Sequence, residues 1–151
     1  MEIKDKSLEE LETLSQDIRD RIIDVVSRKG GHFSSTLGAV ELTLGMHYVF
    51  DAYSDPFIFD VSHQCYPHKL LTGRWEEFES IRQFGGLSGF TKPNESSADY
   101  FVAGHSSTSI SLAVGAAKAI ALKKENRVPV VMIGDGSMTA GMVYEALNEL
   151  G

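Results

Sequence analysis

Apolar side chains recur at helical spacing near the start of the chain and predict an amphipathic helix. The sequence Ser-Leu-Glu-Glu at positions 7–10 is a capping-box pattern, which marks a helix start. Gly30 and Gly31 end the repeat. Residues 37–50 are apolar on nearly all sides, which is typical of a helix packed against several neighbours. The apolar positions of the first helix are Leu8, Leu11, Leu14, Ile18, Ile22 and Val25.

Short apolar runs alternate with helical patterns over the rest of the chain. Strands are predicted at residues 57–59, 100–103 and 128–133. Helices are predicted at residues 67–73, 75–83, 106–124 and 138–150, and the glycine-rich segment 85–96 is predicted to be a mobile loop. Strands separated by helices imply right-handed crossovers and a parallel sheet. We therefore predict an α/β fold with a mostly parallel sheet flanked by helices.

The composition is that of a soluble globular protein, and it narrows the range of partners. A formal net charge of -7 argues against a nucleic-acid partner, because proteins that bind the phosphate backbone present basic surfaces. The single cysteine, Cys65, cannot form an intrachain disulfide, which favours the cytoplasm. The N-terminus lacks a secretory signal pattern, and the apolar run at residues 110–122 is too short to span a membrane. We therefore expect a cytoplasmic protein with no membrane segment.

The strongest local signal for chemistry is the turn that follows the predicted strand 128–133. Gly134 and Gly136 allow a tight turn, which leaves the amides of Gly136 and Ser137 facing an anion at a helix start. Asp135 offers a hard oxygen to a divalent cation such as magnesium that also touches that anion. The alternative for this turn is a glycine turn with an aspartate N-cap.

A second turn of the same kind follows the predicted strand 100–103. Gly104, His105 and Ser106 lead into the predicted helix and add a second set of amide and hydroxyl donors. In open α/β sheets, ligands bind beyond the carboxyl ends of the strands, so the two turns together predict a diphosphate site. The alternative is that Ser106 or Ser107 is a helix cap. A serine-hydrolase elbow is excluded because Thr108 stands where the second glycine is needed.

Three histidines stand in polar segments at the ends of predicted elements: His32, His63 and His68. Each could serve in acid-base chemistry, although a structural histidine is the alternative for any one of them, and His47 within an apolar helix is interpreted as structural. A zinc site is disfavoured, because the sequence has no His-x-x-x-His pattern on a helix and no cysteine pair.

Five motifs, in order and spread over nearly the whole chain, resemble the successive signatures of the 1-deoxy-D-xylulose-5-phosphate synthase family. Together they distinguish this family from transketolase, which is similar in fold and cofactor. The resemblance implies a three-layer sandwich of the thiamine-diphosphate-binding fold, with residues 1–151 as an N-terminal, incomplete diphosphate- and magnesium-binding domain. The motifs are Gly30-Gly31-His32-Phe33-Ser34-Ser35, Asp60-Val61-Ser62-His63-Gln64, Tyr66-Pro67-His68-Lys69-Leu70-Leu71-Thr72-Gly73, Gly104-His105-Ser106-Ser107-Thr108-Ser109-Ile110-Ser111 and Gly134-Asp135-Gly136-Ser137-Met138-Thr139-Ala140-Gly141-Met142.

The resemblance also implies a reaction, its cofactors and a role for each matching residue. Pyruvate and D-glyceraldehyde 3-phosphate would condense to 1-deoxy-D-xylulose 5-phosphate with release of carbon dioxide, the first step of the non-mevalonate isoprenoid pathway. Thiamine diphosphate and Mg²⁺ would be the cofactors, and the enzyme would be a homodimer. By the family pattern His32 would transfer protons, Asp135 would bind magnesium, Gly136 and Ser137 would hold the diphosphate, and the remaining cofactor contacts would be His63, Gly104, His105 and Ser106.

The chain also departs from the family pattern. The second magnesium ligand of the family, an asparagine, and the domain that holds the far side of the cofactor would lie beyond Gly151, so we expect the isolated chain to be inactive. Ser62, Cys65 and Ser137 stand where glycine or alanine is common in the family. Two alternatives remain, a transketolase-like enzyme with a different donor and a non-catalytic domain that kept the fold.

Overall fold

The computed structural model describes residues 3–151, which form two compact units. The first unit consists of the described residues up to Asp51 together with His63–Gly89, and the second consists of Ala52–Ser62 and Phe90–Gly151. Within the described residues, no helix is long and apolar enough to cross a membrane.

The long helix α1 (Leu8–Lys29) forms the base of the first unit and confirms the predicted amphipathic helix. Its capping box is present, since the Ser7 hydroxyl accepts a hydrogen bond from the Glu10 amide and the Glu10 carboxylate accepts one from the Ser7 amide. The helix ends at Gly30, whose φ of 78° lies in the region that favours glycine. The predicted apolar face is buried at Leu14, Ile18, Ile22 and Val25.

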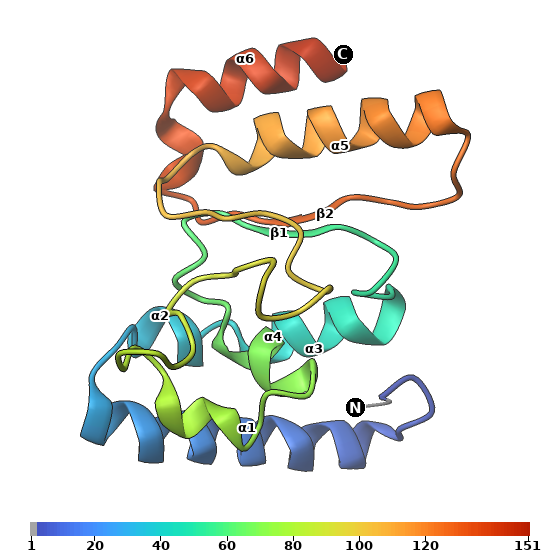
Figure 1. Cartoon of the computed structure of the whole chain (residues 1–151). Coiled ribbons are helices and arrows are strands. Elements are labelled where there is room, and N and C mark those ends of the chain that lie inside the picture. The colour runs from blue at the N-terminus through green and yellow to red at the C-terminus, as the bar shows by residue number, and fades with distance from the viewer. Residues whose placement is uncertain (1–2) are drawn as a thin grey trace. The chain divides into compact units, whose positions relative to one another are not determined.

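Three further helices pack in this unit: α2 (Ser34–Leu37), α3 (Val40–Val49) and α4 (Tyr66–Leu71). Helix α3 and α4 both contact α1, as Figure 1 shows. The helix predicted at 37–50 begins only at Val40, because a turn at Gly38 and Ala39 separates it from α2.

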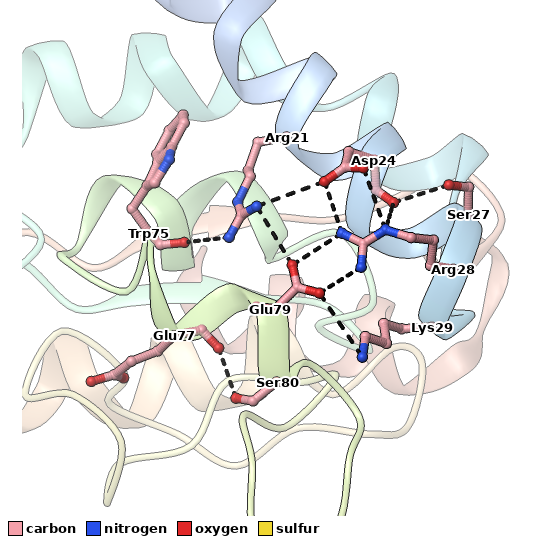
Figure 2. Close-up of polar contacts among 9 residues, drawn as sticks. All are labelled: Arg21, Asp24, Ser27, Arg28, Lys29, Trp75, Glu77, Glu79 and Ser80. Atoms are coloured by element: carbon pink, nitrogen blue, oxygen red, sulfur yellow. Dashed lines mark hydrogen bonds and ion pairs between the residues drawn. The ribbon is translucent and has the colours of Figure 1, made fainter.

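The prediction of a helix at residues 75–83 is wrong, because this segment forms only one short 3₁₀ turn, η1 (Glu77–Ser80). The chain leaves the helical conformation because Arg82 has a φ of 59° and its amide donates to the Leu87 carbonyl instead of continuing a helix. Figure 2 shows how η1 is joined to α1: Glu79 lies between the guanidinium groups of Arg21 and Arg28. Residues 85–96 contain turns and no helix or strand, in agreement with the predicted loop.

The second unit is built on a parallel pair of strands, β1 (Phe57–Phe59) and β2 (Val130–Met132), in which Ile58 lies opposite Val131. Helix α5 (Ser109–Lys123) packs on both strands, and α6 (Gly141–Leu150) packs on α5. In Figure 1, α5 therefore lies between α6 and the strands. Parallel strands with a helix between them confirm the predicted α/β class. The predicted helix at 138–150 is divided into a 3₁₀ turn, η2 (Ser137–Thr139), and α6.

The strand predicted at residues 100–103 does not form, and the described residues contain a sheet of two strands. Two side-chain hydroxyl groups make hydrogen bonds to backbone carbonyls in this region. The Thr91 hydroxyl donates to the carbonyl of Phe101 at 2.9 Å, and the Tyr100 hydroxyl donates to the carbonyl of Tyr53 at 2.7 Å. An apolar run can therefore follow an extended path without joining the sheet.

Candidate functional site

The two turns that the sequence predicts to lie together are in contact in the second unit. The Ser107 hydroxyl donates to the carbonyl oxygen of Ser137 at 2.8 Å. Ser107 belongs to the segment that leads into α5, and Ser137 follows the glycine turn after β2. This contact brings the segment 104–109 and the turn 134–137 to the same end of the strands.

A buried aspartate, Asp60, joins these turns, and sequence analysis gave it no role of its own. Its amide donates to the Met132 carbonyl, which extends the β1–β2 ladder by one residue. Its carboxylate accepts hydrogen bonds from the amide of Ser107 at 2.9 Å, and from the amide and hydroxyl of Ser109 at 3.2 and 2.6 Å. We call Asp60, Ser107, Ser109 and Ser137 the Asp60 cluster.

The Asp60 cluster keeps its carboxylate ionised. Burial alone would raise the pKa of Asp60, whose exposed fraction is 1%. Hydrogen bonds from Ser109, Ser107 and the Ser137 side chain outweigh burial, so the pKa lies below its ordinary value. The signal that could have revealed Asp60 is its position directly after a buried strand, the position that Asp135 shares near the end of β2.

The glycine turn after β2 presents Asp135 at the surface. One carboxylate oxygen of Asp135 accepts a hydrogen bond from the Gly136 amide at 2.9 Å, and the Thr139 hydroxyl donates to the Gly136 carbonyl at 2.7 Å. The Gly136 amide, predicted to face an anion, is therefore bonded to Asp135 in this structure. A Cβ built at Gly134 or Gly136 would meet no atom within 4 Å, so the space above both glycines is open.

The segment Gly104, His105 and Ser106 is exposed beside the Asp60 cluster. A Cβ at Gly104 would also meet no atom within 4 Å. Ser107 has a φ of 71°, a strained conformation for a residue with a side chain, and its amide and hydroxyl are both hydrogen-bonded. Asp60 uses the amides of Ser107 and Ser109, so donors for a ligand remain in residues 104–106.

The other predicted site residues, His32 and His63, lie together in the first unit. Their ring centroids are 5.4 Å apart in an edge-on arrangement. The His32 amide donates to the Tyr66 hydroxyl at 3.4 Å, and the Thr36 hydroxyl donates to the His63 carbonyl at 3.1 Å. Nδ1 of His63 is buried and has no hydrogen-bond partner within the described part of the chain. Such an atom is a candidate for a ligand contact.

The surroundings of His32 favour its neutral form. Burial lowers its pKa most, and electrostatic interactions with His63 and Arg82 lower it further. A neutral imidazole near pH 7 can accept a proton.

His47 and His68 form a separate pair, in which His68 is buried and His47 is half-buried. Nε2 of His47 lies 2.9 Å from Nδ1 of His68, which agrees with a structural role for His47. Over residues 3–151, no group of three or more histidine, cysteine, aspartate or glutamate side chains is placed to hold a metal ion.

Several known proteins that are similar to this chain carry the same name. The family model described as 1-deoxy-D-xylulose-5-phosphate synthase matches residues 1–151. Proteins named 1-deoxy-D-xylulose-5-phosphate synthase are 89% identical in Aliarcobacter butzleri, 76% in Nitratiruptor sp. and 72% in Campylobacter hominis, each over 151 residues. Each match covers 100% of this chain and 25% of the relative, so the chain spans about a quarter of the length of these relatives.

Proposed function

The chain belongs to the 1-deoxy-D-xylulose-5-phosphate synthase family, and we propose that it carries the magnesium- and diphosphate-binding part of such an enzyme. The full-length enzyme would condense pyruvate with D-glyceraldehyde 3-phosphate to 1-deoxy-D-xylulose 5-phosphate and carbon dioxide. It would act in the cytoplasm as a homodimer with a three-layer thiamine-diphosphate-binding fold. The structural observation that carries the proposal is the hydrogen bond between Ser107 and Ser137, which holds two turns at the same strand ends.

Three features of the second unit fit a bound magnesium diphosphate. Asp135 is exposed and offers the kind of hard oxygen that Mg²⁺ prefers. Open space above Gly104, Gly134 and Gly136 would let a diphosphate approach the backbone closely. Ser106 and Ser137 would add hydroxyl or amide donors there. We propose that Asp135 binds the metal and that Gly104, His105, Ser106, Gly136 and Ser137 hold the cofactor.

The proposal also gives roles to His63 and His32, which belong to the first unit. A buried ring nitrogen without a partner costs about 1–3 kcal/mol, and a cofactor atom that bonds to Nδ1 of His63 would remove that cost. Thiamine diphosphate, when bound, supplies the electron sink for carbon-carbon chemistry at pyruvate. His32, neutral at the pH of the cytoplasm, would accept and return a proton near the reacting carbons.

Turnover by the full-length enzyme tests the proposal. With Mg²⁺ and thiamine diphosphate present, we expect carbon dioxide and 1-deoxy-D-xylulose 5-phosphate from pyruvate and D-glyceraldehyde 3-phosphate. Asp135→Asn should weaken magnesium-dependent cofactor binding, and Asp17→Asn on the exposed face of α1 is the matched control. His32→Ala should lower kcat by about 10²-fold or more with little change in cofactor affinity. Turnover of a ketose phosphate in place of pyruvate would instead favour a transketolase-like donor.

A further inference from the structure

We propose that Asp60 is a positioning residue that sets the two cofactor-binding turns in place, so that cofactor affinity depends on its carboxylate. The inference rests on the proposed function, because it assigns Asp60 a role toward the cofactor of that enzyme. Asp60 would not touch the cofactor. It would act through Ser107, Ser109 and Ser137.

A backbone hydrogen bond to the neighbouring strand fixes the position of Asp60. Its amide donates to the Met132 carbonyl at 2.8 Å, directly after the register in which Phe59 lies opposite Met132. The carboxylate is therefore attached to the most regular part of the second unit. A side chain held in this way can position loops that lack a regular backbone pattern of their own.

The carboxylate is linked to both turns. On the side of α5 it accepts three hydrogen bonds, two from backbone amides and one from the Ser109 hydroxyl. It reaches the glycine turn through Ser107, whose amide donates to Asp60 and whose hydroxyl donates to the Ser137 carbonyl. A change at Asp60 would therefore shift Ser107 and, through Ser107, the glycine turn.

The contacts of Asp60 also determine which donors remain for a ligand. The first amides of a helix favour a negative group, and the Asp60 carboxylate already accepts from the amide of Ser109, the first residue of α5, and from the amide of Ser107 just before the helix. A diphosphate would then be left with the donors of residues 104–106 and of Ser137, and it would take the Gly136 amide only in exchange for the bond of that amide to Asp135. Ser107 has a strained backbone with a φ of 71°, and Asp60 supports that conformation through the hydrogen bond from the Ser107 amide.

Replacement of one carboxylate oxygen by an amide group breaks this arrangement without changing its size. Asp60→Asn can keep the hydrogen bonds of one oxygen, but in either orientation its NH₂ group would face a backbone amide that also donates. We expect the dissociation constant of thiamine diphosphate at fixed Mg²⁺ to rise about 10-fold to 100-fold, the range found for residues that orient metal and cofactor ligands. At saturating cofactor, kcat and the KM for pyruvate should return to near the wild-type values, because Asp60 does not touch the reacting atoms.

The matched control is Asp55→Asn, at the other end of the same two strands. Asp55 also accepts a backbone hydrogen bond, from the amide of Val128 at 2.9 Å, but it lies before β1 rather than after it. Loss of its charge should leave cofactor affinity within about twofold of wild type. The pair of variants separates a positional effect from a general effect of removing one carboxylate.

Ser109→Ala is a milder variant, because it removes only the 2.6 Å hydroxyl bond to Asp60. We expect a loss of affinity of about 3-fold to 10-fold. The double variant of Asp60→Asn with Ser109→Ala should bind the cofactor no worse than Asp60→Asn alone, since Ser109 acts through Asp60. If Asp60→Asn does not fold, Ser109→Ala decides the question.

The experiment is calorimetric titration of the full-length enzyme with thiamine diphosphate at fixed Mg²⁺, followed by steady-state kinetics at saturating cofactor. Wild-type affinity in a folded Asp60→Asn or Ser109→Ala variant would overturn the positioning role and leave the proposed function intact. A loss of kcat that saturating cofactor does not restore would overturn it too. If the wild-type enzyme does not bind thiamine diphosphate, the proposed function fails and the positioning role fails with it.

Discussion

Gly31 lies directly against the hydroxyl of Tyr66, so that a Cβ at position 31 would stand 2.8 Å from the Tyr66 oxygen. The Tyr66 ring cannot easily move away, because it is fully buried and packs edge-on against Phe78 at 5.4 Å between centroids. The same hydroxyl accepts the His32 amide at 3.4 Å. The glycine before His32 thus allows the backbone to approach a buried tyrosine.

The first prediction concerns this contact. Gly31→Ala should destabilise the chain by about 1–3 kcal/mol in urea denaturation, because the new methyl group overlaps the Tyr66 hydroxyl and the φ of 153° is unfavourable for alanine. Adding Tyr66→Phe removes the overlapping oxygen and should recover part of the loss. Gly30→Ala is the control, since nothing lies within 4 Å of its Cβ and Tyr66→Phe should not relieve it. Equal losses with and without Tyr66→Phe would contradict the contact.

The second prediction concerns the charge near His32. The positive charge of Arg82 contributes to the lowered pKa of His32. Removing that charge in Arg82→Met should raise the His32 pKa toward its ordinary value of about 6.5. If His32 acts as a neutral base, the acid limb of the kcat/KM profile of the full-length enzyme should move to higher pH. Lys4→Met is the control, and an unmoved acid limb in Arg82→Met would argue against the assignment of His32.

Elements with local signals could be predicted from the sequence. Helix α1 begins and ends where Ser7, Glu10 and Gly30 indicate, because a capping box and a glycine stop act within a few residues of the chain. The strand at 57–59 was predicted at its observed bounds, and its pairing with β2 follows from the helix between them.

Features that depend on distant side chains could not be predicted in this way. Residues 100–103 have the composition of a strand, but they do not join the sheet, and Phe101 and Tyr100 bond instead to the Thr91 hydroxyl and the Tyr53 carbonyl. Asp60 is 47 and 49 residues away from Ser107 and Ser109, so its hydrogen bonds leave no periodic pattern in the sequence. The candidate turns were visible as glycine and serine patterns, whereas the carboxylate that joins them was not.

The third prediction tests the start of α1. Ser7→Ala removes the hydroxyl that accepts the Glu10 amide and should cost about 1 kcal/mol of unfolding free energy. Ser27→Ala in the same helix is the matched control. The Ser27 hydroxyl donates to the Asp24 carbonyl within the helix, and alanine favours a helix interior, so this change should be neutral or stabilising. Equal decreases in the free energy of unfolding for the two variants would show that the capping box does not stabilise the start of α1.

The fourth prediction concerns the ion pairs between α1 and η1 in Figure 2. Glu79 accepts from Arg28 at 2.6 Å and lies 3.6 Å from Arg21, whereas the Glu77 side chain points away from these cations. Glu79→Gln should lower the urea midpoint in low salt, and the difference from wild type should vanish near 1 M NaCl, where charges are screened beyond about 3 Å. Glu77→Gln should leave the midpoint unchanged at both salt concentrations. A loss in Glu79→Gln that persists in high salt would mean that packing, not charge, joins the two elements.

The fifth prediction is a pH dependence that arises from the pair of His47 and His68. Burial is the main cause that lowers the pKa of His47, and the neighbouring His68 lowers it further. Asp51 raises it slightly, and the resulting pKa is about 3. In the unfolded chain the pKa of a histidine is about 6.5. Above that pH the ring is neutral in both states, and the His47 contribution to stability is fully present.

Below about pH 6.5 the unfolded chain binds a proton that folded His47 does not bind, so the free energy of unfolding must fall as the pH falls toward 3. The slope from this one group can reach about 1.4 kcal/mol per pH unit. We expect urea denaturation between pH 6.5 and 4.5 to give a shallower slope for His47→Gln than for wild type. Leu42→Asn, on the exposed side of the same helix, should keep the wild-type slope. Parallel slopes for wild type and His47→Gln would mean that His47 takes up a proton in the folded chain as readily as in the unfolded one.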